Sequence, residues 1–126
     1  MQRFASPRSR SIRAFTPRGQ ELDSLADSEA LRGRFFSWRG ASGRRFVCSV
    51  FQRGEEGFVS DVERGAIIGV ASDGGVLRPV CVFAAAERRS RDALRKVGRE
   101  LVVVEWHVHF CPDIEAVRDL AGSLLN

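Results

Sequence analysis

A tight turn, Ser72-Asp73-Gly74-Gly75, lies between two apolar runs and constrains the fold of this chain more than any other short feature. Asp-Gly flanked by apolar runs is typical of a β-hairpin, because both residues tolerate the positive φ angles that a two-residue hairpin turn requires. The sequence therefore predicts a hairpin whose strands are Ala66–Ala71 and Leu77–Ala85.

The chain after this hairpin changes its period. Small and apolar residues recur at helical spacing over residues 86–97, and Gly98 stands where a helix C-cap glycine is common. Leu101–Phe110 (LVVVEWHVHF) is rich in β-branched and aromatic residues and predicts a strand. Pro112 and the apolar spacing beyond it predict a final helix. Because a strand–helix–strand step is too long for a hairpin, we expect a crossover connection.

Two further strands are predicted before the hairpin, Arg34–Trp38 and Arg45–Gln52, joined by a glycine-containing turn. The second is apolar on both faces, as in a strand that is covered on both sides. Leucines among acids and alanines predict a short helix over residues 21–32. We therefore expect an α/β (α+β) fold: a small mixed sheet of about five strands with helices packed on it, and the order hairpin-helix-strand-helix in the C-terminal half.

The net charge of +4 is concentrated near the N-terminus. Residues 1–20 hold five arginines and no acid, whereas the rest of the chain holds 15 basic and 16 acidic side chains. Without an apolar period, residues 1–20 are expected to form a disordered Arg-rich tail that is dispensable for folding, followed by a single domain over residues 21–126. That domain is close to neutral, which weakens the case for nucleic acid as its partner.

The cysteines and the hydropathy pattern bear on localisation. Cys48, Cys81 and Cys111 stand far apart with no C-x-x-C pair, as expected of free thiols in a reducing compartment. No apolar run approaches the roughly 18 residues of a membrane span. We expect a cytoplasmic protein with no membrane partner. The alternative is organellar targeting, because the first 20 residues are rich in Arg and Ser and free of acids, as transit peptides are.

The last predicted strand carries a candidate metal site. Side chains alternate along a strand, so Glu105, His107 and His109 project to one face, while Trp106 and Phe110 project to the other and are expected in the core. Two histidines with an acid are ligands that zinc or another divalent metal accepts. The alternative is an ordinary polar strand face with hydrogen-bonded histidines and no cofactor.

The helix after the hairpin carries a candidate binding surface. Arg88, Arg91, Arg95 and Arg99 fall on one stripe of that helix, and guanidinium groups match phosphate or carboxylate oxygens. Around the first predicted turn, Trp38 with Arg44 and Arg45 combines an aromatic ring with positive charge, as in proteins that stack single-stranded nucleic acid. The alternative is an ordinary solvated face. An arginine excess from coding bias, with Lys96 as the one lysine, also fits.

From Gly65 to the C-terminus, the order of elements resembles the GIY-YIG nuclease family. Gly65-Ala-Ile-Ile-Gly69 stands in the place of that family's first strand motif and Val80-Cys-Val-Phe-Ala84 in the place of the second. The resemblance implies a role for an arginine on the next helix, for which Arg91 is the best match. It also implies a metal-binding glutamate, but Glu115 stands too early in its helix for that role.

The chain departs from the family pattern where the chemistry would lie. It has no tyrosine, although the family's tyrosines serve in general base chemistry, and Ile67, Ile68 and Val82 stand where its motifs have polar or aromatic groups. The resemblance therefore implies a catalytically inactive member.

No complete catalytic motif is present, which favours a non-enzymatic role. We expect an interaction module that binds a protein partner, or an acidic polymer, through the tail and the Arg88–Arg99 face. Two alternatives stay open: a metal-assisted hydrolase or nuclease that uses His107, His109 and Glu105, and a nucleic-acid binder without sequence preference. Sequence alone gives no oligomeric state.

Overall fold

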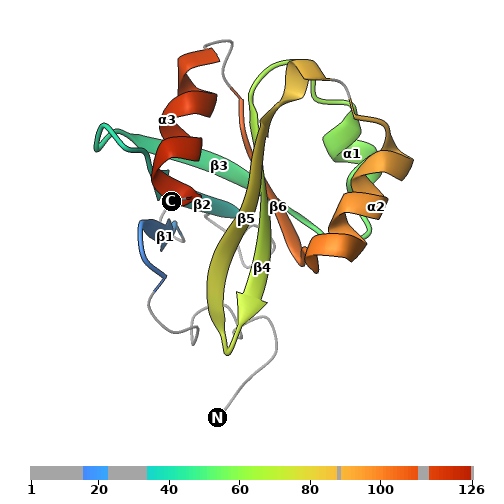
Figure 1. Ribbon diagram of the computed structural model, residues 1–126, viewed down its shortest axis with the longest axis horizontal. Helices are drawn as coiled ribbons and strands as arrows, with labels where there is room; N and C mark the ends of the chain where they lie inside the picture. The colour runs from blue at the N-terminus through green and yellow to red at the C-terminus, as the bar shows by residue number, and fades with distance from the viewer. Residues whose placement is uncertain (1–15, 23–33, 88, 111–113, 126) are drawn as a thin grey trace.

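Within residues 16–22, 34–87, 89–110 and 114–125, which the computed structural model describes, six strands form one curled antiparallel sheet with helices on both faces (Figure 1). The strand order is β1-β2-β3-β6-β4-β5, so β1 and β5 are the edges. The elements are β1 (Gly19–Glu21), β2 (Phe35–Arg39), β3 (Arg45–Gln52), α1 (Glu56–Ser60), β4 (Ala66–Asp73), β5 (Val76–Ala84), a 3-10 turn (Ala85–Glu87), α2 (Arg91–Leu101), β6 (Glu105–His109) and α3 (Ile114–Leu124).

The sheet separates two apolar cores. The core shared with α3 contains Phe36, Trp38, Phe46, Cys48, Val50, Ala66, Ile68, Val70, Leu77, Ala116 and Leu120. The core shared with α1 and α2 contains Val59, Ile67, Phe83, Ala85, Leu94, Val103, Trp106 and Val108. Strand β6 lies between β3 and β4, and four of its five residues are buried, so both of its faces are covered.

The hairpin predicted around Asp73 is confirmed. Strands β4 and β5 pair from Ala66↔Ala84 to Asp73↔Val76, with a bulge where the register shifts between Gly69 and Val70. The turn residues Gly74 and Gly75 have φ angles of 60° and 87°, in the region that favours glycine.

The crossover step explains why the sheet is antiparallel throughout rather than mixed. Strand β6 pairs with β4 and with β3, each time antiparallel, and not with β5. Helix α2 therefore carries the chain past β4, and the two strands that it joins run parallel to each other with β4 between them. The α/β (α+β) class is as expected, with an edge strand, β1, in addition to the expected strands.

Helix α2 is displaced from the predicted segment. It begins at Arg91, where the Ser90 side chain accepts a hydrogen bond from the Ala93 N–H at 3.1 Å, and it continues past Gly98 to Leu101. Gly98 is not a cap: it is buried inside the helix, and a Cβ there would meet the Trp106 ring at 3.4 Å. The helix ends instead at a left-handed residue, Val102, and the strand predicted from Leu101 begins only at Glu105.

The N-terminal boundary also differs from the expectation. Gly19–Glu21 pairs with β2, and the Thr16 hydroxyl accepts a hydrogen bond from the Leu77 N–H at 3.2 Å. Residues 16–20 are therefore part of the fold and not of a disordered tail; residues 1–15 lie outside the described part. So does the helix predicted over residues 21–32, except for Glu21, which ends β1, and Leu22.

Candidate protein-interaction surface

Most of the histidine strand is buried, and its histidines are hydrogen-bonded within the fold. Glu105 and His107 are 2% and 0% exposed. The Trp38 Nε1–H donates to His107 Nδ1 at 2.8 Å, so Nδ1 is an acceptor. The proton then resides on His107 Nε2, which donates to Glu105 Oε1, also at 2.8 Å. Both ring nitrogens of His107 are thus engaged within the fold.

His109 forms a hydrogen bond with the backbone of β3. Its Nδ1–H donates to the Val47 carbonyl at 2.9 Å, because a carbonyl oxygen only accepts. In the part of the chain that the structure describes, no group of three or more His, Cys, Asp or Glu side chains lies together as metal ligands would. Cys111 is outside that part. Zinc or another divalent metal at Glu105, His107 and His109 therefore has no geometric support.

The expected separation of core and surface residues on this strand is partly wrong. Trp106 is fully buried, as predicted, but Phe110 is 58% exposed because β6 has ended before it. His107, expected outside the core, is among the fully buried side chains. The partner that satisfies it is Trp38, which sequence spacing cannot place: it lies on β2 and reaches past β3 in the curled sheet.

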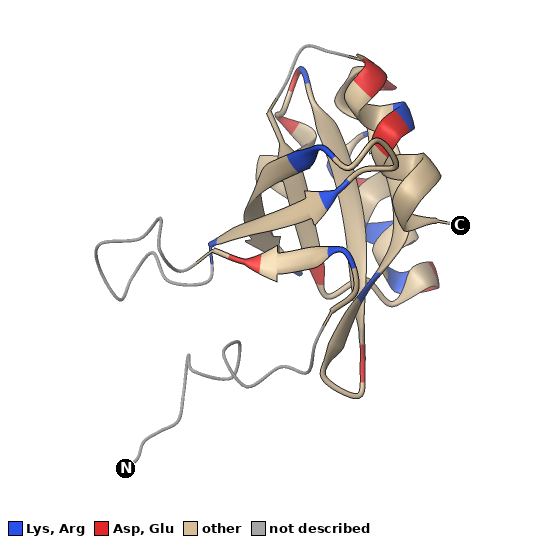
Figure 2. Ribbon diagram, turned by 90° about the vertical axis from the view of Figure 1, so that its left-hand side faces the viewer, with Lys and Arg blue, Asp and Glu red and all other residues tan. Residues whose placement is uncertain are grey.

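The group around the first turn does not form a base-stacking site. Trp38 is 0% exposed, so no base reaches its ring. Arg44 lies over the Phe46 ring at 4.7 Å, and Arg45 Nη1 donates to the Ser37 hydroxyl at 3.3 Å. Figure 2 shows basic and acidic positions interspersed on this side of the molecule.

The arginine stripe lies on α2, next to α1. Arg91, Arg95 and Arg99 are exposed, whereas Arg88 is outside the described residues. Neighbouring carboxylates partly offset the positive charge of Arg95, since its Nε lies 3.8 Å from Glu56 Oε1 and its Nη1 lies 3.9 Å from Asp92 Oδ1. Among the described residues Arg91 makes no ion pair with a carboxylate, so its guanidinium is available to a partner.

A buried glutamate fixes α1 in place. Trp106 Nε1–H donates to Glu56 Oε2 at 3.0 Å, and the Gly54 N–H donates to Glu56 Oε1 at 3.2 Å. Burial of Glu56 opposes its ionisation, but these hydrogen bonds and the nearby Arg95 outweigh burial and hold the pKa of Glu56 below its usual value. Helix α1 is not predicted by the sequence, because five residues are too few for a periodic signal.

The outer side of α1 forms a ridge, defined by Phe58 and Asp61, between two hollows. The first, which we call the helix hollow, has a volume of about 650 Å³. Its lining residues are Gly54, Glu55, Gly57, Phe58, Ser60, Asp61, Arg91 and Arg95. The second, the aromatic hollow, has a volume of about 640 Å³. Its lining residues are Phe51, Phe58, Asp61, Val62, Glu63, Arg64 and Phe110. Phe58 is 65% exposed on this ridge.

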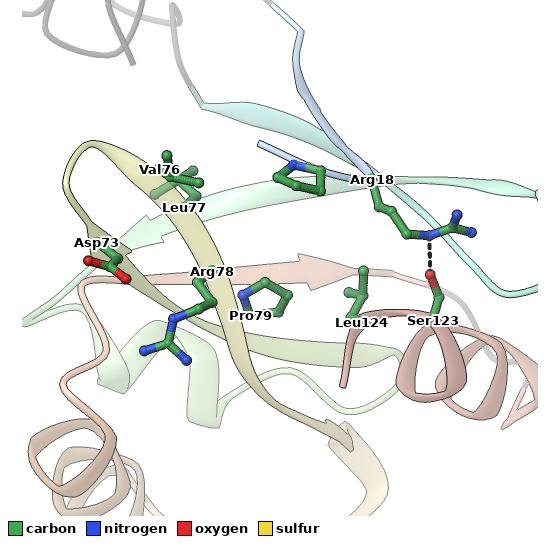
Figure 3. A pocket seen from close by; sticks show the side chains of 9 residues that line it. Arg18, Asp73, Val76, Leu77, Arg78, Pro79, Ser123 and Leu124 are labelled. Carbon is green, nitrogen blue, oxygen red and sulfur yellow. Dashed lines mark hydrogen bonds between the residues drawn. The ribbon is translucent and has the colours of Figure 1, made fainter. Parts of the chain in front are cut away.

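A third hollow lies between the two sheet edges (Figure 3). It has a volume of about 500 Å³, with mainly apolar walls that include Pro17, Leu77, Pro79 and Leu124. The Arg18 guanidinium is bonded to the Ser123 hydroxyl and to the Gly40 carbonyl. Figure 3 shows the remaining charged side chains, on Asp73 and Arg78, apart from that pair. Polar groups therefore do not converge here as they would around a reacting substrate.

Comparison with known proteins gives no family. No family model, curated protein or solved structure matches the chain significantly. Among the described residues no helix is both long and apolar enough to cross a membrane. The case for a function therefore rests on the residues and contacts above.

Proposed function

We propose that this protein is a non-enzymatic interaction module that binds a protein partner through the α1 ridge and the exposed side of α2. The observation that carries this proposal is the placement of Phe58: its ring is 65% exposed and lines two hollows, on a helix that the Glu56–Trp106 hydrogen bond ties to the sheet. Phenylalanine and arginine are both enriched at protein interfaces, and Arg91 lines the same hollow as this ring.

Rigidity of the platform supports this reading. An exposed aromatic side chain loses little entropy on binding when its backbone is already fixed. Glu56 accepts hydrogen bonds from Trp106 and Gly54 beneath the ridge, so α1 is held on the sheet through a buried side chain. A partner that covers Phe58 therefore meets a preformed surface.

The same surface is a poor match for a nucleic acid or another acidic polymer. Asp92 and Glu100 interrupt the arginine stripe of α2, and Glu55 and Asp61 line the helix hollow beside Arg91. A phosphate backbone would meet these carboxylates as well as the guanidinium groups. The hydrolase alternative has no observation in its favour, since His107 and Glu105 are buried and bonded to one another.

We also propose that the protein is cytoplasmic. Cys48 and Cys81 are free thiols, and burial raises the pKa of both. A protonated thiol is unreactive, so buried Cys48 and half-buried Cys81 act as small apolar side chains, as expected in a reducing compartment.

The test is site-specific photo-crosslinking in the cell of origin. A benzophenone amino acid replaces Phe58 in the full-length chain, and a matched variant carries it at Leu125, which is 46% exposed beyond α3. We expect a discrete protein adduct from position 58 that is absent from position 125 and is lost when Arg91→Glu is added. Equal adducts at both positions, or none at position 58, would contradict the proposal.

A further inference from the structure

The exposed Phe58 side chain lies next to a hollow that can accept a side chain of the same kind. Phe58 has an exposed ring that also forms part of the wall of the aromatic hollow, whose other apolar lining residues are Phe51, Val62 and the exposed Phe110. A phenylalanine is the kind of side chain that such a hollow accepts, because aromatic rings pack favourably edge to face or offset. The chain thus presents both halves of one contact.

Opposite charges lie on the two sides of Phe58. Arg91 and Arg95 line only the helix hollow, on one side of Phe58, whereas Glu63 lines only the aromatic hollow, on the other side. Glu55 and Arg64 reduce this contrast, and the ion pair of Arg95 with Glu56 reduces it further. Arg91 and Glu63 remain as opposite charges at the two ends of the surface.

We propose that the partner of the α1 ridge is a second copy of this chain, in a two-fold symmetric dimer. This inference rests on the proposed function and names its partner. A two-fold axis that passes between Phe58 and the aromatic hollow places each Phe58 ring in the other copy's hollow. The same rotation brings Arg91 of each copy toward Glu63 of the other.

A second copy fits this surface better than a partner of one charge sign. An acidic segment that paired with Arg91 would also meet Asp61 and Glu63, and a basic segment would meet Arg91 and Arg95. Like charges at an interface disfavour a partner strongly. A second copy carries both a positive and a negative charge, and the two-fold rotation places Arg91 of each copy opposite Glu63 of the other.

Sedimentation equilibrium of the purified full-length chain tests this inference, over about 1–100 μM, where dimers of moderate affinity dissociate. We expect a monomer–dimer equilibrium. Phe58→Ser should weaken it by about tenfold or more, the effect of losing one interface anchor. The matched control, Leu125→Ser, should leave it unchanged. Far-ultraviolet circular dichroism checks that each variant is folded.

Exchanging the charges of Arg91 and Glu63 tests whether these two residues face each other across the dimer interface. Arg91→Glu and Glu63→Arg should each weaken the dimer, and the double variant should restore it to within about threefold of the original. A monomer at all concentrations, a larger oligomer, or no restoration in the double variant would overturn the inference. If the chain is a monomer but position 58 still crosslinks to a different protein in the cell, the result contradicts the dimer and supports the proposed interaction module.

Discussion

Trp38 and His107, 69 residues apart, are joined by a hydrogen bond of 2.8 Å from the indole Nε1–H to the imidazole Nδ1. Both side chains are fully buried, and the Phe36 ring lies 5.0 Å from His107. The bond fixes the tautomer of His107 and thereby directs its Nε2–H to Glu105. The sequence suggested Trp38 for a base-stacking site and His107 for a metal site. In the structure, their hydrogen bond connects β2 to β6.

Trp38→Phe tests that connection. The substitution keeps an aromatic ring but leaves His107 Nδ1 without its donor in a buried position, so we expect a loss of about 1–3 kcal/mol in the free energy of unfolding. Urea denaturation followed by circular dichroism measures it. The control is Val47→Ala, on an exposed strand position, which should cost far less. Equal losses would show that the hydrogen bond contributes little to stability.

Glu56 gives a dependence of stability on pH. Because its folded-state pKa lies below the usual 4.5, its contribution is fully present above that pH and is lost as the pH falls through the folded-state value. Glu56→Gln removes the charge, so we expect the variant to be less stable than the parent at pH 7. The difference should shrink as the pH falls below 4.5. Chemical denaturation across this range measures it, and a constant difference would contradict the assignment.

Val102 is a site for stabilisation. It is a β-branched residue with a φ of 56°, where glycine is favoured, and it ends α2 with a 62% exposed side chain. Val102→Gly should therefore raise the free energy of unfolding by about 1 kcal/mol, since the left-handed strain is relieved. Val47→Gly, in the middle of β3, is the opposite control and should lower it. Thermal unfolding of the two variants gives the comparison, and a lower Tm for Val102→Gly would exclude strain at this cap.

The N-terminal residues are expected to contribute to stability. Deleting residues 1–20 removes most of β1 and also the Thr16 hydroxyl that accepts the Leu77 N–H. We expect Tm to fall by several degrees, about the effect of 1 kcal/mol or more in a domain of this size. A variant that lacks only residues 1–15 is the matched control, because it keeps β1. If both deletions shift Tm equally, the β1 contacts have no measurable effect.

The sequence predicted those elements whose signal is local. The β4–β5 hairpin follows from Asp73-Gly74, and β3 was predicted at its observed bounds, because turn chemistry and strand composition are short-range. Ser90 also marks the start of α2 locally, as an N-cap whose side chain bonds the Ala93 N–H, although the apolar spacing alone placed the start earlier.

The missed features depend on contacts between distant segments. Strand β1 has only three residues and forms because β2 supplies its hydrogen bonds. Gly98 resembles a cap in sequence, yet it lies inside α2 because the Trp106 ring packs against it. The environment of His107 also depends on distant residues: Trp38 donates to its Nδ1, and Glu105 accepts from its Nε2–H.

The outer side of β5 limits how copies of this chain associate. Its Leu77 N–H is already bonded to the Thr16 hydroxyl, and its Ala84 N–H is bonded to the Glu87 carboxylate. Pro79, two residues beyond Leu77 on the same side of the strand, has no N–H to offer. An incoming strand would find these donors occupied or missing, so the edge resists lateral growth into larger sheets or fibrils.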